Sequence, residues 1–296
     1  MALPPLYKYL NVDGAKKTLG NRCLRFAKPS EYEDLEDMTV QSLFPDELET
    51  ALVILSDGFV DAIAANPYAP PTCSPKLRPA VVKLQKLFRE YPHLVPFMKQ
   101  ELRNDPTKAG LNVDYWRTRS DAFVEETNEF MQNYRVLCVT TDKASERMWK
   151  EYAKDSSGIA LRITPCVEKA SKFELFAPVT YREQRPAIYA KTIDFAGDTL
   201  FGDHAAKTRA IMDTIIYSKT NDYKFESEYR LAIPLGEGEE DYRTLPYHPE
   251  EISELYLGSA MNDKDKQEIL ATAKAFNPAI KVFQVKQTGS ITFEAL

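Results

Sequence analysis

The chain has 296 residues, of which 44% are hydrophobic and 28% charged; these are ordinary values for a globular domain and exclude a disordered or fibrous chain. Its net charge of -6 argues against a protein that binds nucleic acid through its overall field, although a local basic groove stays compatible with it. The four cysteines are scattered and form no C-x-x-C pair, so the sequence indicates neither a zinc knuckle nor a disulfide framework.

The N-terminal residues, M-A-L-P-P-L-Y-K-Y, lack the basic and then apolar layout of a signal peptide. No apolar run approaches the length that a bilayer-spanning segment needs. We therefore expect no membrane association and a cytoplasmic location.

The first elements expected are a strand over residues 6–10, a short helix capped by Asn11, and a strand over residues 22–27. Lys8 and Tyr9 end the first strand just before the helix, where they could face a ligand. A surface lysine beside a packed tyrosine is an equally good interpretation of the residues alone.

From about residue 35 to residue 134 the pattern predicts helices. Apolar residues at helical spacing begin near Leu48, Val81, Leu94 and Trp116, and a proline-rich loop covers residues 66–79. We expect this region to be an all-helical insertion in a single domain of residues 1–296.

A strand is expected over residues 135–141, followed by a short helix that Ser145 caps and a strand over residues 159–163. Thr140 and Thr141 would expose two hydroxyls where the first of these strands ends. Threonine in such places more often satisfies the backbone of the turn, so a structural role is the competing interpretation.

Further strands are expected over residues 173–181, 252–257, 280–285 and 290–294, and helices over residues 205–217 and 263–276. No internal repeat or low-complexity segment interrupts the pattern.

The stretch Lys219–Leu235 has two carboxylates where an apolar strand is expected to begin. In an extended chain Glu226, Glu228 and Arg230 would share one face, with Phe225 and Tyr229 on the other. Two neighbouring carboxylates can have separated pKa values, or Arg230 can hold one acid while the other meets a substrate. An ordinary exposed strand face carrying Glu and Arg is the competing interpretation.

Three motifs stand in order: L-Y-K-Y, then C-V-T-T with M-W-K-E-Y-A-K-D-S-S-G-I-A-L, then K-F-E-S-E-Y-R after a lysine. This order resembles an uncharacterised bacterial family whose members look like distant ADP-ribosyltransferases. The family typically has L-Y-[HK]-Y, then C-F-S with W-x-x-Y-x-x-x-x-x-G, then a lysine before Y-E-x-E-x-R. The resemblance implies an α+β fold, an ADP-ribosyltransferase-like split β-sheet or sandwich that binds NAD in a central cleft, here with the helical insertion at about 35–134.

The resemblance also assigns roles to residues. Glu228 takes the position of the catalytic carboxylate that contacts the ribose next to nicotinamide, and Glu226 that of the accessory Glu of an E-x-E pair, which would orient or deprotonate the acceptor nucleophile. The residues assigned to cofactor binding are Lys8, Tyr9, Thr140, Thr141, Trp149, Tyr152, Lys219 and Arg230. Among them, Arg230 or Lys219 would neutralise phosphate or hold a Glu, and Tyr9 or Trp149 would stack on a ring.

The function expected is an NAD-dependent ADP-ribosyltransferase with a protein, a nucleic acid or water as acceptor. The resemblance permits a toxin or phage-defence effector with an antitoxin or immunity partner. Lys8 stands where such enzymes have His or Arg, which favours a non-catalytic nucleotide-sensing module as an alternative. A metal-dependent nuclease-like enzyme is the other alternative, but no third Asp, Glu or His stands at recognisable metal spacing, so no metal site is expected.

Overall fold

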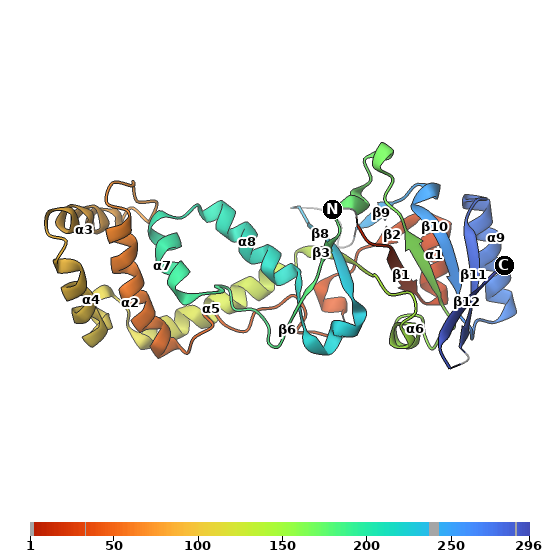
Figure 1. Ribbon diagram of the computed structural model, residues 1–296, viewed down its shortest axis with the longest axis horizontal. Coiled ribbons are helices and arrows are strands. Elements are labelled where there is room, and N and C mark those ends of the chain that lie inside the picture. The colour runs from red at the N-terminus through yellow and green to blue at the C-terminus, as the bar shows by residue number, and fades with distance from the viewer. Residues whose placement is uncertain (1–2, 33, 237–242, 288) are drawn as a thin grey trace. The chain divides into compact units, whose positions relative to one another are not determined.

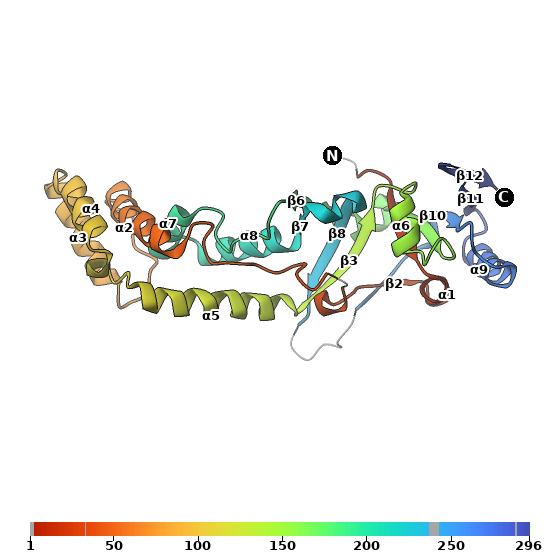
Figure 2. The same cartoon turned by 90° about the horizontal axis from the view of Figure 1, so that it is seen from below.

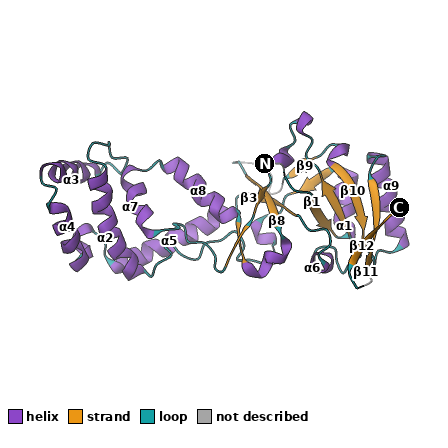
Figure 3. Ribbon diagram, in the orientation of Figure 1, coloured by secondary structure: helices purple, strands orange, loops and turns teal. Residues whose placement is uncertain are grey.

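The structure is a computed structural model that describes residues 3–32, 34–236, 243–287 and 289–296. Strands and helices both occur along the chain, which confirms the expected α+β class. The chain divides into two units (Figures 1 and 3). The sheet unit contains the described residues of Met1–Asp37, Gln132–Glu183 and Lys219–Leu296. The helical unit consists of Met38–Met131 and Gln184–Ser218.

The sheet unit is built on a mixed sheet of eight strands. In spatial order these are β12 (Ile291–Ala295), β11 (Lys281–Gln287), β10 (Ile252–Leu257), β4 (Ile159–Ile163), β1 (Leu6–Leu10), β3 (Tyr134–Thr140), β8 (Glu228–Pro234) and β5 (Ala177–Pro178). Neighbours are antiparallel except β10 and β11, which are parallel. Two small sheets pair β2 (Cys23–Arg25) with β9 (Thr244–Pro246), and β6 (Thr180–Arg182) with β7 (Ser218–Thr220).

The two faces of the sheet carry separate apolar cores because side chains alternate along each strand. On one face Leu6 packs in a core with α1 (Val12–Asn21) and α9 (Asp263–Phe276). On the other face Tyr7 and Tyr9 pack with Trp149 of α6 (Glu146–Glu151). Figure 2 shows α6 on one side of the sheet and α1 and α9 on the other. As predicted, the side chain of Asn11 caps α1, and its Oδ1 accepts from Gly14 N at 2.8 Å.

β1 and β3 pair at a single register position, Tyr7 opposite Thr140. Continuation of that register would set Tyr9 opposite Cys138, but Lys8 Nζ donates instead to the carbonyl oxygen of Cys138 at 2.9 Å. On its other side β3 pairs with β8 along its whole length, so Thr140 lies between Tyr7 and Glu228. The sheet is therefore loosely joined between β1 and β3 and tightly joined between β3 and β8.

Two expected strands differ from the structure. The strand over residues 173–181 is interrupted: Lys172–Leu175 forms a 3₁₀ turn that Ser171 begins, and only the short β5 and β6 follow. Pro178 limits pairing there because it has no N–H to donate. The strand over residues 22–27 is reduced to β2. It starts later because Arg22 takes a left-handed conformation (φ 55°) as the cap of α1, and beyond Arg25 the described chain has only an isolated bridge from Ala27 to Val136.

The helical unit is arranged around α2 (Leu48–Ala65), which packs against α3 (Arg78–Glu90), α4 (Leu94–Asn104), α5 (Val113–Met131) and α7 (Thr192–Phe201); α8 (His204–Ile216) follows α7. α2 and α7 approach so closely at Gly58 that an added Cβ would lie 2.6 Å from a methyl group of Ile193. Among the helices described, none is both long and apolar enough to cross a membrane.

The helices expected between residues 35 and 134 are present as α2, α3, α4 and α5. The unit they form is not one contiguous segment, because α7 and α8, far along the chain, belong to it as well. α7 was not expected from the sequence, although Ile193, Ala196 and Leu200 follow helical spacing.

Candidate functional site

The buried carboxylates of the sheet unit gather around Arg230. As the two-residue spacing predicts, Glu228 and Arg230 share a face of β8, and the Arg230 Nε and Nη2 atoms donate to the two oxygens of Glu228 at 2.9 and 3.0 Å. The same guanidinium donates to both oxygens of Asp37 at 3.0 and 2.6 Å. Arg230 is completely buried, so two bidentate contacts compensate the desolvation of its charge.

Glu226 does not lie on the strand with Glu228, contrary to the expectation from the sequence. Residues Asn221–Glu226 form a 3₁₀ turn, η5, and Ser227 follows with φ 45°, so the alternation of faces starts only at Glu228. Glu226 nevertheless points back to the same place, because Lys219 Nζ lies 2.7 Å from its Oε2. The ammonium is also 3.6 Å from Asp37 and 3.7 Å from Glu228, and so lies between three carboxylates.

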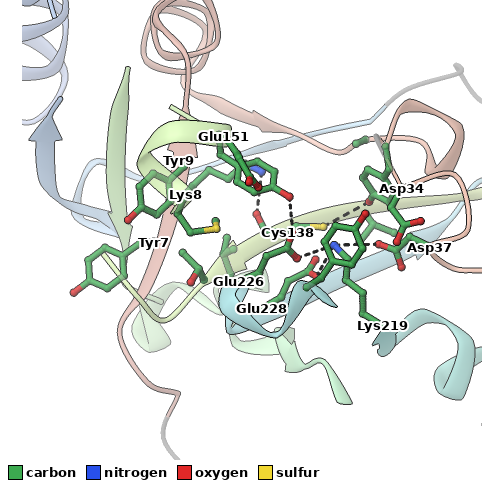
Figure 4. A pocket seen from close by; sticks show the side chains of 18 of the residues that line it. Tyr7, Lys8, Tyr9, Asp34, Asp37, Cys138, Glu151, Lys219, Glu226 and Glu228 are labelled. Atoms are coloured by element: carbon green, nitrogen blue, oxygen red, sulfur yellow. Dashed lines mark hydrogen bonds and ion pairs between the residues drawn. The ribbon is translucent and has the colours of Figure 1, made fainter. Parts of the chain in front are cut away.

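The second partner of Glu226 comes from a segment 74 positions away in the sequence. The hydroxyl of Tyr152, the residue after α6, donates to Glu226 Oε1. The hydroxyl of Tyr181 accepts from the backbone N–H of Glu228 at 2.8 Å and so holds the start of β8. Segments far apart in the sequence therefore converge on the two glutamates (Figure 4).

The environments of the two glutamates move their pKa values in opposite directions. Burial on its own raises the pKa of Glu228, but the charge and hydrogen bonds of Arg230 outweigh burial and hold this pKa at about 2. Burial, together with the negative charge of Glu228, raises the pKa of Glu226 to about 7, because Lys219 opposes these effects only in part. At neutral pH one carboxylate is permanently ionised and its neighbour exchanges a proton, which is the usual division between an electrostatic stabiliser and an acid–base group.

The other titratable groups do not supply a nucleophile. Burial lowers the pKa of Lys219, but the three carboxylates around the ammonium raise this pKa by more than burial lowers it. The ammonium therefore stays charged. Burial raises the pKa of Cys138 to about 12, so this thiol is not ionised at neutral pH and is a poor nucleophile. Asp37 is also buried, and its pKa is raised by burial and by Glu228 against the opposing effect of Arg230.

A cavity of about 340 Å³ opens beside these groups, where β1 and β3 diverge. Its volume is at the lower end of those of small-molecule sites. Six acidic residues line it: Glu31, Asp34, Asp37, Glu151, Glu226 and Glu228. The basic residues in its lining are Lys8, Arg25 and Lys219. This composition favours a ligand, or a part of a ligand, that carries positive charge.

Of the residues expected to bind a cofactor, Lys8, Tyr9, Thr140, Tyr152 and Lys219 line this cavity. Thr140 Oγ1 accepts from Asp142 N at 3.0 Å, which is the structural role that the sequence left open for it.

Three other expected cofactor-binding residues are not in the lining of the cavity. Arg230 is completely buried and acts through Glu228 and Asp37. Trp149 is also completely buried; its Nε1 donates to Lys143 O at 2.9 Å and its ring packs edge-on against Tyr9. Thr141 contacts the carbonyl oxygen of Ser227 at 3.5 Å through its hydroxyl.

Sequence reasoning missed Asp37, Tyr32 and Cys138. Asp37 is the last residue of an acidic run, E-Y-E-D-L-E-D, that a sequence shows only as a polar surface segment. The Tyr32 hydroxyl lies 3.6 Å from the sulfur of Cys138, and both residues line the cavity. The alternation along β3 could have indicated Cys138, since it lies on the same face of that strand as Thr140.

The described part of the chain contains no group of three His, Cys, Asp or Glu side chains arranged to hold a metal ion. Asp37, Glu226 and Glu228 are three acidic side chains in one place, but the Lys219 ammonium lies between them. A divalent cation would have to displace that charge.

The sequence profile of a family described as "Protein of unknown function (DUF2971)" matches residues 148–231, which run from Met148 in α6 to Leu231 in β8 and include Tyr152, Glu226 and Glu228. No curated protein and no solved structure matches the chain. The relation to ADP-ribosyltransferases expected from the three motifs therefore stays a prediction.

Proposed function

We propose that the chain is an NAD-dependent ADP-ribosyltransferase that cleaves the bond between nicotinamide and ribose in this cavity. The observation that supports the proposal best is the pair of glutamates with opposite pKa shifts, one ionised and one exchanging its proton near pH 7, in one pocket. Two carboxylates tuned apart in this way suit the cleavage of a glycosidic bond through an oxocarbenium-like transition state.

The proposed reaction divides its two tasks between the glutamates. When the C1′–N bond breaks, the bonding electrons leave with nicotinamide, which departs neutral and needs no proton. The ribose acquires positive charge, and the Glu228 carboxylate stabilises it because Arg230 keeps that carboxylate ionised and oriented. Glu226 accepts the proton of the acceptor hydroxyl or of water as the new C1′–O bond forms.

The strand arrangement supports the same assignment. Lys8, Thr140 and Glu228 lie on β1, β3 and β8, which are neighbours in the sheet, and Thr140 is the register partner of both Tyr7 and Glu228. These are the positions at which the resemblance expects a basic residue, a hydroxyl residue and the catalytic glutamate. The divergence of β1 from β3 agrees with a split sheet that opens at the cofactor.

The charge of the cavity suggests which end of NAD would enter it. The ring nitrogen of nicotinamide in NAD is positively charged, whereas the diphosphate is negative, and the lining has more acidic than basic residues. We therefore assign the nicotinamide-ribose end to the cavity and the diphosphate to its mouth, near Lys8 or Arg25. Trp149 is too deeply buried to stack on a ring, so Tyr152, which is partly exposed, takes that role in the proposal.

The two alternatives make different demands on the same residues. A nucleotide-sensing module needs the cavity but not the pKa difference between the glutamates. A nuclease-like enzyme needs a metal where the Lys219 ammonium now lies. The transferase proposal needs an acceptor for the ADP-ribose, and we propose a protein or a nucleic acid, as expected of a toxin or a phage-defence effector.

The experiment follows nicotinamide release from NAD by the purified protein without added metal. Glu228→Gln removes the stabilising charge, and we expect release to fall about a hundredfold or more. Glu226→Gln should reduce transfer of labelled ADP-ribose to bacterial extract more than it reduces release, and should remove the rise of transfer with pH near 7. Circular dichroism checks that both variants keep the fold.

Glu254→Gln is the matched control, because Glu254 is also a buried sheet carboxylate paired with an arginine, Arg162, at 2.7 Å, and it does not line the cavity. Its variant should release nicotinamide at the wild-type rate. Binding of NAD without release would support the sensing module, and turnover only with added divalent metal would support the nuclease-like alternative. Glu228→Gln with full activity would contradict the proposed mechanism.

A further inference from the structure

The helical unit has a basic surface that the proposed function does not use. Residues 74–93 contain five lysines and arginines and a single acidic residue, Glu90, in a chain whose net charge is -6. Most of these residues belong to α3. Positive charge is therefore concentrated on one helix, against the sign of the chain as a whole.

The packing of α3 directs these charges outward. Val81, Gln85 and Phe88 are buried in the helical unit. Lys83, Lys86 and Arg89, spaced three apart, lie together on the exposed side of the helix. With Arg78 they line a hollow whose other residues are Pro75, Pro79 and Val82. No acidic side chain in the described chain contributes to this lining.

An exposed aromatic ring lies at one end of the basic surface. The Tyr68 side chain is 83% exposed, and the guanidinium of Arg89 lies 5.0 Å from the centre of its ring. The loop that carries Tyr68 is held against α3: the buried Gln85 side chain donates to Asn66 O and Ala69 O, and Arg89 donates to Pro67 O. The ring is thus held beside the basic residues, and little ordering is needed to use it.

We propose that this surface, Arg78, Lys83, Lys86 and Arg89 together with Tyr68, binds single-stranded nucleic acid. Lysines and arginines in a row attract the phosphate backbone, and an exposed aromatic ring gives an unpaired base a face on which to stack. From Arg78 to Arg89 the helix rises about 16 Å, which corresponds to about five nucleotides at the spacing of about 3.4 Å per nucleotide of one strand. Five nucleotides is within the range of site sizes of proteins that bind single strands.

The same features make a lipid surface a poorer partner. A helix that binds membranes inserts its apolar face, and the apolar face of α3 is buried in the unit. An acidic peptide would meet the lysines but would leave the Tyr68 ring unused. Binding of a single strand is inferred from the helical unit alone and does not depend on NAD cleavage by the sheet unit.

The experiment uses the full chain and fluorescein-labelled mixed-sequence DNA and RNA strands of about 15 nucleotides. Fluorescence anisotropy is measured at several salt concentrations. Lys83→Gln combined with Lys86→Gln should weaken binding about tenfold and reduce the slope of log affinity against log salt by about 1.4, because each lost phosphate contact removes about 0.7. Tyr68→Ala should weaken binding about fivefold or more while leaving the salt slope unchanged.

Lys191→Gln combined with Arg209→Gln is the matched control: both residues are exposed, both belong to the helical unit outside α3, and the change in charge is the same. The control should bind like the wild type. Equal losses in the control and in the α3 variant would overturn the proposal, because they would show a response to net charge only. The same measurement is made with a DNA duplex of the same length and with phosphatidylserine vesicles. Tighter binding of the duplex with no effect of Tyr68→Ala, or binding of the vesicles but not of the strands, would also overturn the proposal.

Discussion

Glu226→Gln tests the electrostatics of the candidate site independently of any activity. Gln keeps the size of the side chain and removes its ability to ionise. In the native protein burial and Glu228 raise the pKa of Glu226 to about 7, from an ordinary value of 4.5. The unfolded chain therefore loses this proton at lower pH than the folded chain does.

The sign and size of the effect follow from that difference. Between about pH 4.5 and pH 7 the folded state holds more protons than the unfolded state, so the contribution of Glu226 to stability is fully present below pH 4.5 and is lost as the pH rises through 7. A difference of about 2.5 pKa units corresponds to about 3 kcal/mol. The stability of Glu226→Gln relative to the wild type should thus increase by about 3 kcal/mol from about pH 4.5 to about pH 8.

Urea unfolding at several pH values measures this quantity, and a single tryptophan can confine the signal to the sheet unit. The chain has two tryptophans, and Trp149 packs against Tyr9 in the sheet unit while Trp116 belongs to the helical unit. A Trp116→Phe background leaves Trp149 as the reporter. Wild-type and variant curves are then compared in that background.

Tyr152→Phe provides a second arm. The Tyr152 hydroxyl donates to Glu226 and lowers its pKa, so its removal should move the fall in stability to higher pH. In a Glu226→Gln background the same change should leave the pH dependence unaltered. Parallel curves of stability against pH for the wild type and Glu226→Gln would refute the reasoning, since they would mean that this carboxyl has the same pKa in both states.

Two further predictions concern the same unit. Lys219→Met removes the cation between the carboxylates and should lower the free energy of unfolding by about 3 kcal/mol or more at pH 8. The loss should be smaller at about pH 5, where Glu226 takes up a proton. Urea unfolding at the two pH values measures the difference, and equal losses would contradict the prediction. Trp149→Phe removes the hydrogen bond to Lys143 and leaves a cavity, so it should lower the free energy of unfolding by about 2 kcal/mol. A calorimetric titration should show the same affinity for NAD as in the wild type. A selective loss of NAD affinity would instead mean that Trp149 belongs to the cofactor site.

The sequence predicts best where a local rule determines the structure. Asn11 and Ser145 begin helices as their side chains allow, and the two-residue spacing of Glu228 and Arg230 sets them on one strand face. The helix that Ser145 begins is followed by β4 at the expected bounds, because apolar periodicity and the turn residues agree there.

The rest of the site depends on contacts that no local rule encodes. Asp37 is 193 positions from Arg230 in the sequence, and its acidic neighbours made it look like a surface residue. Glu226 was expected on the strand because no residue in F-E-S-E indicates that Ser227 is left-handed and ends a 3₁₀ turn. The left-handed conformation of Ser227 also brings Glu226 to Lys219. It therefore explains both why the strand prediction is wrong at Glu226 and where Glu226 lies in the site.

The charges of the assembled site explain why one proton is held there. Three buried carboxylates meet two cations, so full ionisation would leave an excess negative charge in a poorly solvated place. Glu228 and Asp37 each accept two hydrogen bonds from Arg230, whereas Glu226 has one from Lys219 and one from the neutral hydroxyl of Tyr152. The proton therefore belongs on Glu226. A positively charged group that enters the cavity would supply the missing cation and favour ionisation of Glu226, so a substrate such as the nicotinamide end of NAD would itself turn that residue into a base when it binds.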